Sequence, residues 1–375
     1  MKLAEFFRQH APTYLDNHKV SPEQARVLRH LIDCRTPALG GHADVCRDCG
    51  KSWHTFNSCR DRHCPTCQGA QQLRWIQARQ ERLIPTHHFH VVFTLPEPLR
   101  PVALANRECI YNLLFHAASA TILDLAKTHW DAQPGITAVL HTWTRQMMFH
   151  PHLHCIVTGG GLADDDGWVH AKPNFLFPVR VMGKLFRGKF VDGLRRAYQN
   201  KVLQFTGTSS HLERPETFHD LIQSLYYNNW VVYAKRPFGG AQQVVRYLGR
   251  YTHRVALSSS RVVSIDDNQI VFKTKGKRTC ALKPDEFIRR FLLHVLPKGF
   301  RKIRHYGLFS PGNVNTRLRL AQQIVGGMNR QPPRVQSSLA LSEVPSAVRR
   351  CPECGSDSLF RMPLPPVRGP PGGVP

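Results

Sequence analysis

Two Cys-x-x-Cys pairs, fourteen residues apart, constrain the fold of this chain more than any other feature. The pairs are Cys46 with Cys49 and Cys64 with Cys67. Each pair can bring two thiolates to one side of a metal ion, and the intervening segment lets the pairs face each other. This spacing predicts one tetrahedral Zn²⁺ site with the four cysteines as ligands and a structural role. The alternative is two buried thiol clusters without metal.

Other cysteines and histidines leave the ligand set open. His42, Cys59 and His63 lie beside the two pairs, so one of them could replace a cysteine or help to bind a second ion. Cys351 and Cys354 form half of a similar site, with no further pair after them. The isolated cysteines are predicted to be packing residues, and these are Cys34, Cys109, Cys155 and Cys280.

The charge balance points to a polyanionic partner. The 375 residues contain 51 Lys and Arg against 26 Asp and Glu, which gives a net charge of +25. This balance argues against an ordinary neutral or acidic enzyme and favours a nucleic acid as the partner. No run of about 18 apolar residues predicts a membrane span. Residues 1–9 lack an apolar signal core, so we expect metal-bound cysteines in a reducing, cytoplasmic compartment.

Residues 235–304 hold more than half of the excess positive charge, with 17 Lys or Arg and 4 Asp or Glu. Phosphate contacts in this region would position a DNA strand without reading its sequence. Phe300, Tyr306 and Phe309 lie among the charges and could stack on unpaired bases. The alternative is a solvated basic face with the aromatic residues in the core. The predicted DNA-binding residues are Arg246, Arg250, Arg254, Arg289, Arg290, Lys298, Arg301, Lys302 and Arg304.

Hydrophobic periodicity and chain breakers predict an α+β fold. Ser21, Pro22 and Gln24 are typical of a capped helix start. Residues 136–144 and 152–158 are predicted strands whose connection is too short for a crossover, so they must be antiparallel. Further strands are predicted at 91–94, 230–234, 261–265 and 270–275. Further helices are predicted at about 68–83, 103–130, 181–203, 215–226, 240–255 and 284–296.

His152 and His154 lie within the second of the two adjacent strands. Side chains two residues apart on a strand share a face, so both imidazoles point the same way. Two imidazoles on a rigid strand can fill two neighbouring corners of a divalent-metal site. The alternative is a pair of hydrogen-bonded histidines at a sheet surface. Candidates for a third ligand are His141, nearly opposite in a tight hairpin, and Gln242, Gln243 and His253.

Two tyrosines follow about ninety residues later. Tyr247 and Tyr251 are four residues apart in the predicted helix at 240–255, which places both hydroxyls on one helix face. Gly249 between them disfavours a helix and indicates the close approach of another chain or backbone. The alternative is two interfacial tyrosines beside a solvated basic stripe.

The two motifs together suggest a chemistry. A tyrosine can act as a covalent nucleophile, but its reference pKa of about 10 means that it needs help. A divalent ion on His152 and His154 could polarise a phosphate oxygen and orient the scissile bond. The product would be a phosphotyrosine that conserves the bond energy for religation.

Four motifs in order resemble those of one protein family. His152 and His154 flank a leucine, similar to the His-hydrophobe-His motif of the HUH endonucleases, and Tyr247 and Tyr251 resemble the pair of the two-tyrosine branch. Two runs resemble the insertion sequence 91 family of rolling-circle transposases, and these are 59–67 (Cys-Arg-Asp-Arg-His-Cys-Pro-Thr-Cys) and 287–300 (Phe-Ile-Arg-Arg-Phe-Leu-Leu-His-Val-Leu-Pro-Lys-Gly-Phe). The resemblance covers about residues 20–330.

The resemblance implies a bacterial enzyme that acts on nucleoid DNA. Such an enzyme nicks one strand at the end of an element and becomes linked to the 5′ phosphate through tyrosine. The free 3′ hydroxyl then primes replication or is joined to a target. The resemblance implies that His152 and His154 bind Mg²⁺ or Mn²⁺ and that Tyr247 and Tyr251 are the nucleophiles.

The resulting expectation is a chain of four parts. An N-terminal helical and zinc-binding domain at 1–85 precedes an antiparallel-sheet HUH nuclease domain (βαββαβα-like) at 86–280. A basic helical DNA-binding extension is expected at 281–330. Residues 331–375 include 10 prolines and are predicted to be disordered.

The sequence leaves two other functions open. A replication initiator or relaxase would share the chemistry and differ in its substrate. A non-catalytic zinc-containing regulator would bind DNA without cutting it. A hydrolytic metalloenzyme is disfavoured because acidic ligands are scarce near the histidines.

Overall fold

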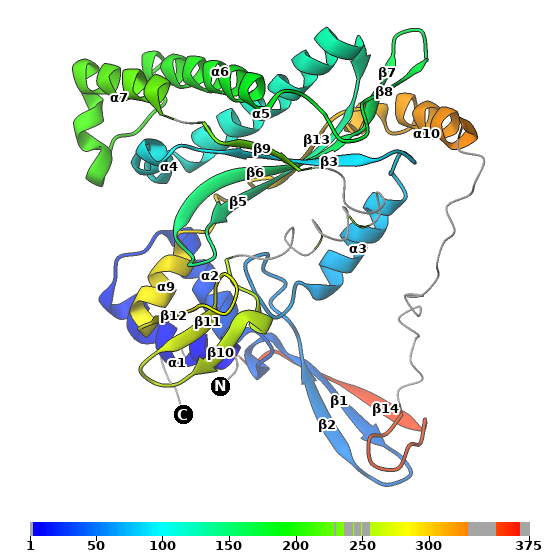
Figure 1. The fold of residues 1–375 in the computed structure, drawn as a ribbon. Coiled ribbons are helices and arrows are strands. Elements are labelled where there is room, and N and C mark those ends of the chain that lie inside the picture. Colours follow the sequence, from blue (N-terminus) through cyan, green and yellow to red (C-terminus); the bar gives the residue numbers. More distant parts are fainter. Residues whose placement is uncertain are drawn as a thin grey trace.

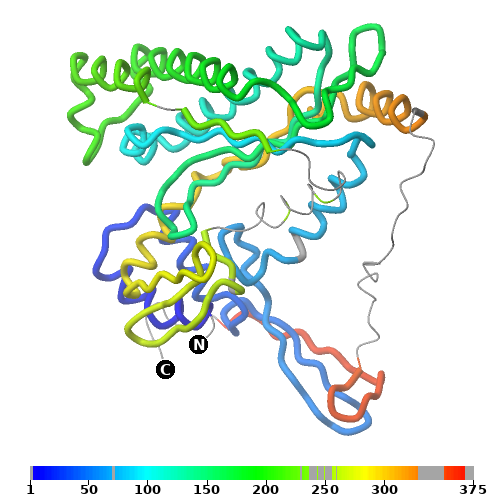
Figure 2. The backbone as a smooth tube through the Cα atoms, in the orientation of Figure 1, coloured from blue at the N-terminus to red at the C-terminus, as the bar shows by residue number. Residues whose placement is uncertain are grey.

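The structure is a computed structural model that describes residues 3–228, 230–235, 243, 249, 256–328 and 350–367. Its described parts form a sheet with helices on both faces, a smaller lobe below that sheet, and a narrow head that extends away from both (Figures 1 and 2). Helices and antiparallel strands are mixed, as the α+β prediction requires.

The central sheet has five strands in the order β13-β5-β6-β3-β9, and every neighbouring pair is antiparallel. The adjacent strands β5 and β6 pair in a register that sets His141 opposite His152. On the other side of β6, Val92 of β3 lies opposite His154. The strands are β3 (His88–Thr94), β5 (Gly135–Trp143), β6 (Phe149–Thr158), β9 (Val232–Lys235) and β13 (Ile303–Gly307).

Four helices cover the face of the sheet that holds the main core (Figure 1). Phe93 of β3 contacts Phe186 of α6 with ring centroids 5.0 Å apart. The residues of β6 alternate, so Leu153 and Cys155 enter this core while the histidines face the other way. The helices are α4 (Arg100–Ala105), α5 (Arg107–Trp130), α6 (Val179–Gln199) and α7 (Pro215–Tyr227).

Helix α5 is long and apolar enough to cross a membrane by length and composition alone. However, 61% of its most apolar window is buried inside this fold. Its apolar side chains pack against the sheet and α6. Core packing therefore explains its hydrophobicity.

Helix α3 (Gly69–Gln80) lies over the opposite face of the sheet. Its Trp75 and Ile76 pack against Val139 of β5 and Ile156 of β6. A small sheet consists of β4 (Ala132–Gln133), β7 (Gly160–Ala163) and β8 (Trp168–His170). Its strand β8 contacts the helix α10 (Arg317–Met328). Part of the histidine-bearing face is thus covered by α3.

The smaller lobe combines segments from two distant parts of the chain. Phe6 and Phe7 pack against Phe287 and Phe291 in its core. Its elements are α1 (Leu3–Asn17), α2 (Pro22–Asp33), β10 (Val262–Ile265), β11 (Ile270–Lys273), β12 (Thr279–Leu282) and α9 (Pro284–Leu292).

The head is a three-stranded sheet of β1 (Gly41–Cys46), β2 (Ser52–Phe56) and β14 (Leu359–Leu364). Strand β14 comes from the segment that was predicted to be disordered. That prediction is wrong for residues 350–367, because β14 pairs with β1 over six residues. Local proline content could not reveal a partner more than 300 residues away.

Most predicted elements are confirmed within a few residues of their bounds. The capping box of α2 is present, with Ser21 Oγ accepting from the Gln24 N–H and Gln24 Oε1 accepting from the Ser21 N–H. The separate extension at 281–330 is corrected, because β13 is a strand of the central sheet and α9 belongs to the smaller lobe. The predicted helix at 240–255 lies outside the described residues, apart from positions 243 and 249.

Candidate functional site

Three histidines converge on the face of the central sheet that looks away from the main core. His152 and His154 come from β6, and His141 comes from β5. Their ring centroids are 5.4 Å apart for His141 and His152, 4.3 Å for His141 and His154, and 4.9 Å for His152 and His154. One ring nitrogen of each lies within 4.8 Å of one nitrogen of the others, which is close enough for one metal ion. We call these residues the histidine trio.

The histidine trio is set up to be neutral. Burial is the main cause of the low pKa values, which are about 4 for His152 and well below 6.5 for His141 and His154. The neighbouring imidazoles lower the pKa of His141 and His154 further. Neutral imidazole is the form that binds a metal. His152 Nδ1 lies 2.8 Å from the His150 carbonyl oxygen and donates to it, which directs Nε2 of His152 toward the site.

A fourth histidine, His90 of β3, supports the trio from the neighbouring strand. Its Nε2 lies 2.8 Å from Nδ1 of His154, and the two rings are stacked with centroids 5.0 Å apart. This contact engages Nδ1 of His154. Burial lowers the pKa of His90 to about 4, so it too is neutral at pH 7. The sequence analysis missed His90. Its only signal was that it lies two residues after His88, and the sequence did not reveal which strand β3 pairs with.

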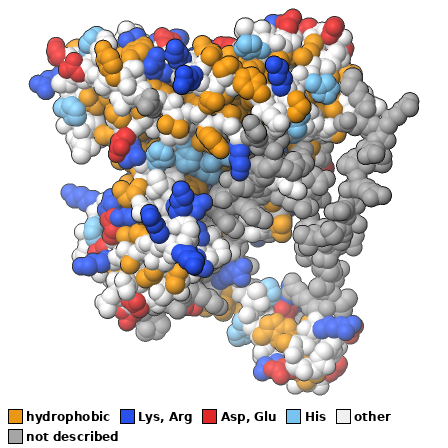
Figure 3. Space-filling model, viewed as in Figure 1, with side chains coloured by type: hydrophobic (Ala, Val, Ile, Leu, Met, Phe, Trp, Pro, Cys, Tyr) orange, Lys and Arg blue, Asp and Glu red, His pale blue; other side chains and the backbone are white. Residues whose placement is uncertain are grey.

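Of the candidates for a third ligand, the structure brings His141 to the pair. Gln243 is described but exposed, and Gln242 and His253 lie outside the described residues. Figure 3 shows histidine side chains gathered between the sheet and the smaller lobe, with Lys and Arg side chains nearby.

Tyr247 and Tyr251 lie outside the described residues. Gly249 between them is described and buried, and a Cβ atom there would come within 2.3 Å of Cγ1 of Ile76. The close approach at Gly249 is therefore made by a side chain of α3, where another chain or backbone was expected. Ile76 in turn packs with the apolar residues of β5 and β6 on the face that carries the histidine trio.

The predicted DNA-binding residues have different surroundings. Arg289 and Arg290 both form ion pairs with Glu286. Arg304 covers the rings of Phe115 and Phe300, with its Cζ atom 4.3 Å and 5.1 Å from their centroids. Lys298 and Arg301 are exposed, whereas burial and the Arg62 guanidinium lower the pKa of Lys302 to about 7. Arg246, Arg250 and Arg254 lie outside the described residues.

The proposed base-stacking role of the aromatic residues is corrected by their burial. Phe300 is 5% exposed and Phe309 is 7% exposed, and both belong to hydrophobic cores. Tyr306 is partly buried and packs against the main core. These rings are therefore not available to unpaired bases.

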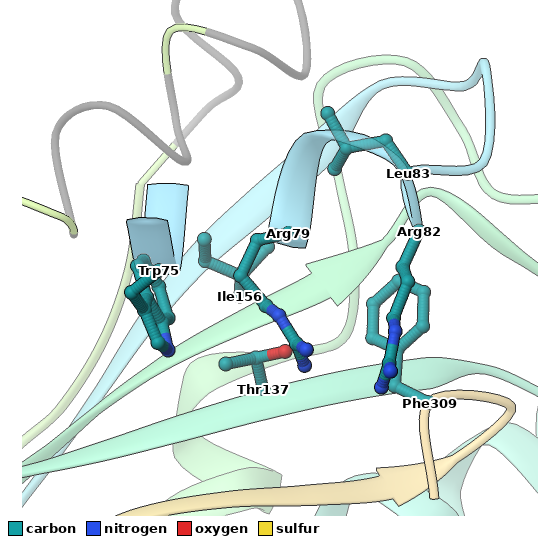
Figure 4. Close-up of a pocket in the computed structure, with 7 residues that line it drawn as sticks. All are labelled: Trp75, Arg79, Arg82, Leu83, Thr137, Ile156 and Phe309. Atoms are coloured by element: carbon teal, nitrogen blue, oxygen red, sulfur yellow. The ribbon is translucent and has the colours of Figure 1, made fainter. Parts of the chain in front are cut away.

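A pocket beside α3 offers a different basic surface (Figure 4). Arg79 and Arg82 line it together with the rings of Trp75 and Phe309, above Thr137 of β5. The Arg79 side chain lies 2.9 Å from Nε2 of His305. The pocket borders the same sheet face as the histidine trio. The sequence analysis missed its two arginines because they lie outside the 235–304 region.

The cysteines form two separate clusters, which corrects the single site predicted from the two Cys-x-x-Cys pairs. Cys64 and Cys67 group with Cys34 and Cys59. The Sγ atoms of Cys34 and Cys64 are 3.6 Å apart, and those of Cys59 and Cys67 are 3.7 Å apart. Two corners of a tetrahedron with Zn–S bonds of about 2.3 Å lie about 3.8 Å apart, so this cluster fits a structural Zn²⁺. Cys34 is thus a candidate ligand and not a packing residue.

The other predicted pair lies elsewhere. Cys46 and Cys49 group with Cys351 and Cys354, so the C-terminal half-site is completed by the N-terminal one. The prediction failed because it paired motifs by their distance along the chain. Cys109, Cys155 and Cys280 belong to neither cluster.

The two histidines near the cysteines have partners other than the clusters. His63 Nδ1 lies 2.9 Å from Asp61, and its Nε2 accepts from the Leu296 N–H at 3.2 Å. Nε2 of His42 lies 3.6 Å from Oδ2 of Asp44. Both ring nitrogens of His63 are therefore engaged, and Cys59 alone of the three open candidates joins a cluster.

Comparisons with known proteins indicate the family of this chain. A family described as "Transposase zinc-binding domain" of the insertion sequence 91 type matches residues 6–95, and one described as "Putative transposase" matches residues 135–317. The chain is 39% identical to "Putative transposase y4qJ" of Sinorhizobium fredii, over 99% of this chain and 97% of that protein. It is 25% identical to "Transposase for insertion sequence element IS801" of Pseudomonas savastanoi pv. phaseolicola, over 76% of this chain and 70% of that protein. This chain therefore belongs to the insertion sequence 91 family of transposases.

Proposed function

We propose that the chain moves an insertion sequence by nicking one DNA strand and transferring it through a 5′-phosphotyrosine intermediate. The observation that carries this proposal is the convergence of His141, His152 and His154 on one sheet face. The fold proposed for the five-stranded domain is that of the HUH endonucleases. The reaction would take place in the bacterial cytoplasm, on nucleoid DNA.

The histidine trio would hold Mg²⁺ or Mn²⁺ through its neutral ring nitrogens. A bound ion would polarise a non-bridging phosphate oxygen and fix the orientation of the scissile bond. The donor set favours Mn²⁺, because Mg²⁺ prefers oxygen ligands. His141 would be the third ligand, since its ring lies within 4.8 Å of the pair.

The tyrosines would supply the nucleophile. In the proposed step the phenol of Tyr247 or Tyr251 loses its proton and its oxygen attacks the phosphorus. A new P–O bond forms as the bond to the 3′ oxygen breaks, and that oxygen takes up a proton to leave as a 3′ hydroxyl. The exchange of one phosphoester for another keeps the bond energy for rejoining. The second tyrosine could hold one strand while the other is cut.

The position of Gly249 supports this assignment. Tyr247 and Tyr251 are each two residues from Gly249 in the sequence. Gly249 contacts Ile76, which packs on the strands that carry the histidine trio. The reach of two residues plus a tyrosine side chain thus favours a shared site.

The proposed partner is DNA, bound as a single strand along the face that carries the histidine trio. Arg79 and Arg82 border this face and would contact phosphates, which position the strand. The exposed Lys298 and Arg301 keep their predicted role as phosphate contacts. Arg289 and Arg290 are weaker candidates because Glu286 already neutralises part of their charge.

Incubation of the purified chain with single-stranded element-end DNA and Mn²⁺ tests the proposal. We expect a covalent protein–DNA adduct that survives denaturation and that Tyr247→Phe/Tyr251→Phe abolishes. The matched control is Tyr226→Phe/Tyr227→Phe at the end of α7, on the far side of the sheet, which should leave the adduct unchanged. An adduct that persists in the first double variant would contradict the proposed nucleophiles.

A further inference from the structure

An N-terminal segment, β1, and a C-terminal segment, β14, meet in the head. The Cys46 and Cys354 Sγ atoms are 3.6 Å apart, and those of Cys49 and Cys351 are 3.5 Å apart. All four Sγ atoms lie within 4.8 Å of one another. The pairing of β14 with β1 sets Leu359 opposite Cys46 and so holds the two pairs side by side.

The two Cys-x-x-Cys pairs have the same backbone geometry. The Cys46 N–H donates to the Lys51 carbonyl at 2.9 Å, and the Cys351 N–H donates to the Ser356 carbonyl at 2.7 Å, five residues on in both cases. Each pair is followed by a glycine in the left-handed region, with φ of 70° at Gly50.

The match extends to the next hydrogen bond. The Gly50 N–H donates to the Cys46 carbonyl at 3.0 Å, and the Gly355 N–H, at a φ of 75°, donates to the Cys351 carbonyl at 2.9 Å. Neither glycine has another atom close to where a Cβ would lie, so the backbone angle and not space favours glycine. Two equivalent tight turns thus present their sulfurs toward each other.

These distances fit a metal and not a disulfide. A disulfide bond is about 2.05 Å long, well below the 3.5–3.6 Å between the sulfurs. They are close to the edge of about 3.8 Å that a tetrahedral four-thiolate Zn²⁺ site requires. Lys51 forms an ion pair with Glu353 at 3.0 Å, which joins the two turns a second time.

We propose that Cys46, Cys49, Cys351 and Cys354 bind a second Zn²⁺, separate from the ion on the cluster of Cys34. The head would then hold a zinc ion of its own, bound jointly by an N-terminal and a C-terminal segment of the chain. The C-terminal segment would be part of the head that the N-terminal domain begins, so the head is complete only in a chain that contains residues 350–367.

Metal analysis of the full-length protein tests this proposal. We expect two Zn²⁺ per chain in the wild type and one in Cys351→Ser/Cys354→Ser. The matched control, Cys109→Ser/Cys280→Ser, changes two cysteines outside both clusters and should keep two. One Zn²⁺ in the wild type, two in the Cys351/Cys354 variant, or iron in place of zinc would overturn the proposal.

A measurement on the wild type alone guards against a variant that fails to fold. Titration with a mercurial reagent should release two Zn²⁺ per chain as the clustered thiols react. Cobalt substitution of the wild type should give the thiolate-to-metal absorption of two four-thiolate sites per chain. Release of a single ion from the folded wild type would contradict a second site, whatever the variants do.

Discussion

At the residue scale, a strand's alternation explains what could be predicted about the histidines. The shared face of His152 and His154 and the position of His141 opposite them both follow from a two-residue period in a tight hairpin, and both are confirmed. His90 could not be found in this way, because β3 reaches β6 only through a pairing of segments 64 residues apart. The cysteines show the same limit, since Cys34 and the C-terminal pair are distant in sequence from their partners.

His90 is predicted to position His154 without binding the metal itself. Replacement by His90→Phe keeps a ring stacked on His154 but removes the hydrogen bond at 2.8 Å. We expect the Mn²⁺ concentration for half-maximal adduct formation to rise by about 10-fold to 100-fold, because such supporting contacts tune metal affinity to that extent. The yield at saturating Mn²⁺ should recover.

The control for this test is His88→Gln. His88 is buried on the same strand, but its hydrogen bond goes to the Thr86 carbonyl. Its Mn²⁺ requirement should equal that of the wild type. Equal Mn²⁺ requirements in His90→Phe and the wild type would show that the contact has no positioning role.

At the element scale, local patterns identified helices with clear caps and strands with clear breaks. The helix α1 was not predicted, because Pro12 lies inside it and argues against a helix, and packing of Phe6 and Phe7 on α9 outweighs that cost. The strand β13 was read as part of a helical extension. Its pairing with β5 is long-range and its residues are partly buried on both faces, so no clear alternation was visible.

His294 connects α9 to the β5–β6 hairpin and makes this contact sensitive to acid. Its Nε2 donates to the Met147 carbonyl at 3.0 Å, and its Nδ1 accepts from Thr142 at 3.2 Å. Burial lowers the pKa of His294 to about 3, and the nearby Arg107 and His63 act in the same direction. The neutral form is therefore the one that the fold holds.

The sign of the effect follows from the lowered pKa. The unfolded chain has a histidine pKa of about 6.5 and binds the proton first, so stability is lost as pH falls below 6.5. At pH 5 the stability lost through His294 amounts to about 2 kcal/mol. The free energy of unfolding in urea should fall between pH 7 and pH 5 for both proteins. For His294→Gln the fall should be about 2 kcal/mol smaller than for the wild type.

The exposed His219 provides the control for this comparison. His219→Gln should lose as much free energy of unfolding as the wild type between the two pH values. Equal losses in the wild type and His294→Gln would contradict a buried neutral imidazole at position 294.

At the scale of the whole molecule, the net charge of +25 predicted a nucleic-acid partner but not its path. Several of the basic residues picked from the sequence are paired or packed, while Arg79 and Arg82 line a pocket next to the site. Charge counts give no information on which side chains are free, because this depends on contacts between distant elements. The C-terminal segment could not be placed from the sequence for the same reason, because its strand β14 forms only by pairing with the distant β1.

Arg82 is predicted to contact a DNA phosphate. Arg82→Gln should weaken binding of single-stranded DNA and reduce the dependence of log K on log salt concentration by about 0.7. Arg180→Gln, an exposed change on α6 at the opposite face of the sheet, is the matched control and should leave the dependence unchanged. Fluorescence anisotropy at several salt concentrations measures both, and equal slopes for Arg82→Gln and the wild type would exclude this contact.

The most direct test of the account identifies the residue that carries DNA. After the adduct forms in Mn²⁺, nuclease and protease digestion followed by mass spectrometry would locate the remaining nucleotide on one peptide. We expect a nucleotide linked through its 5′ phosphate to Tyr247 or Tyr251, and no such peptide from His152→Ala/His154→Ala. A nucleotide on any other residue, or undiminished attachment in that double variant, would contradict it.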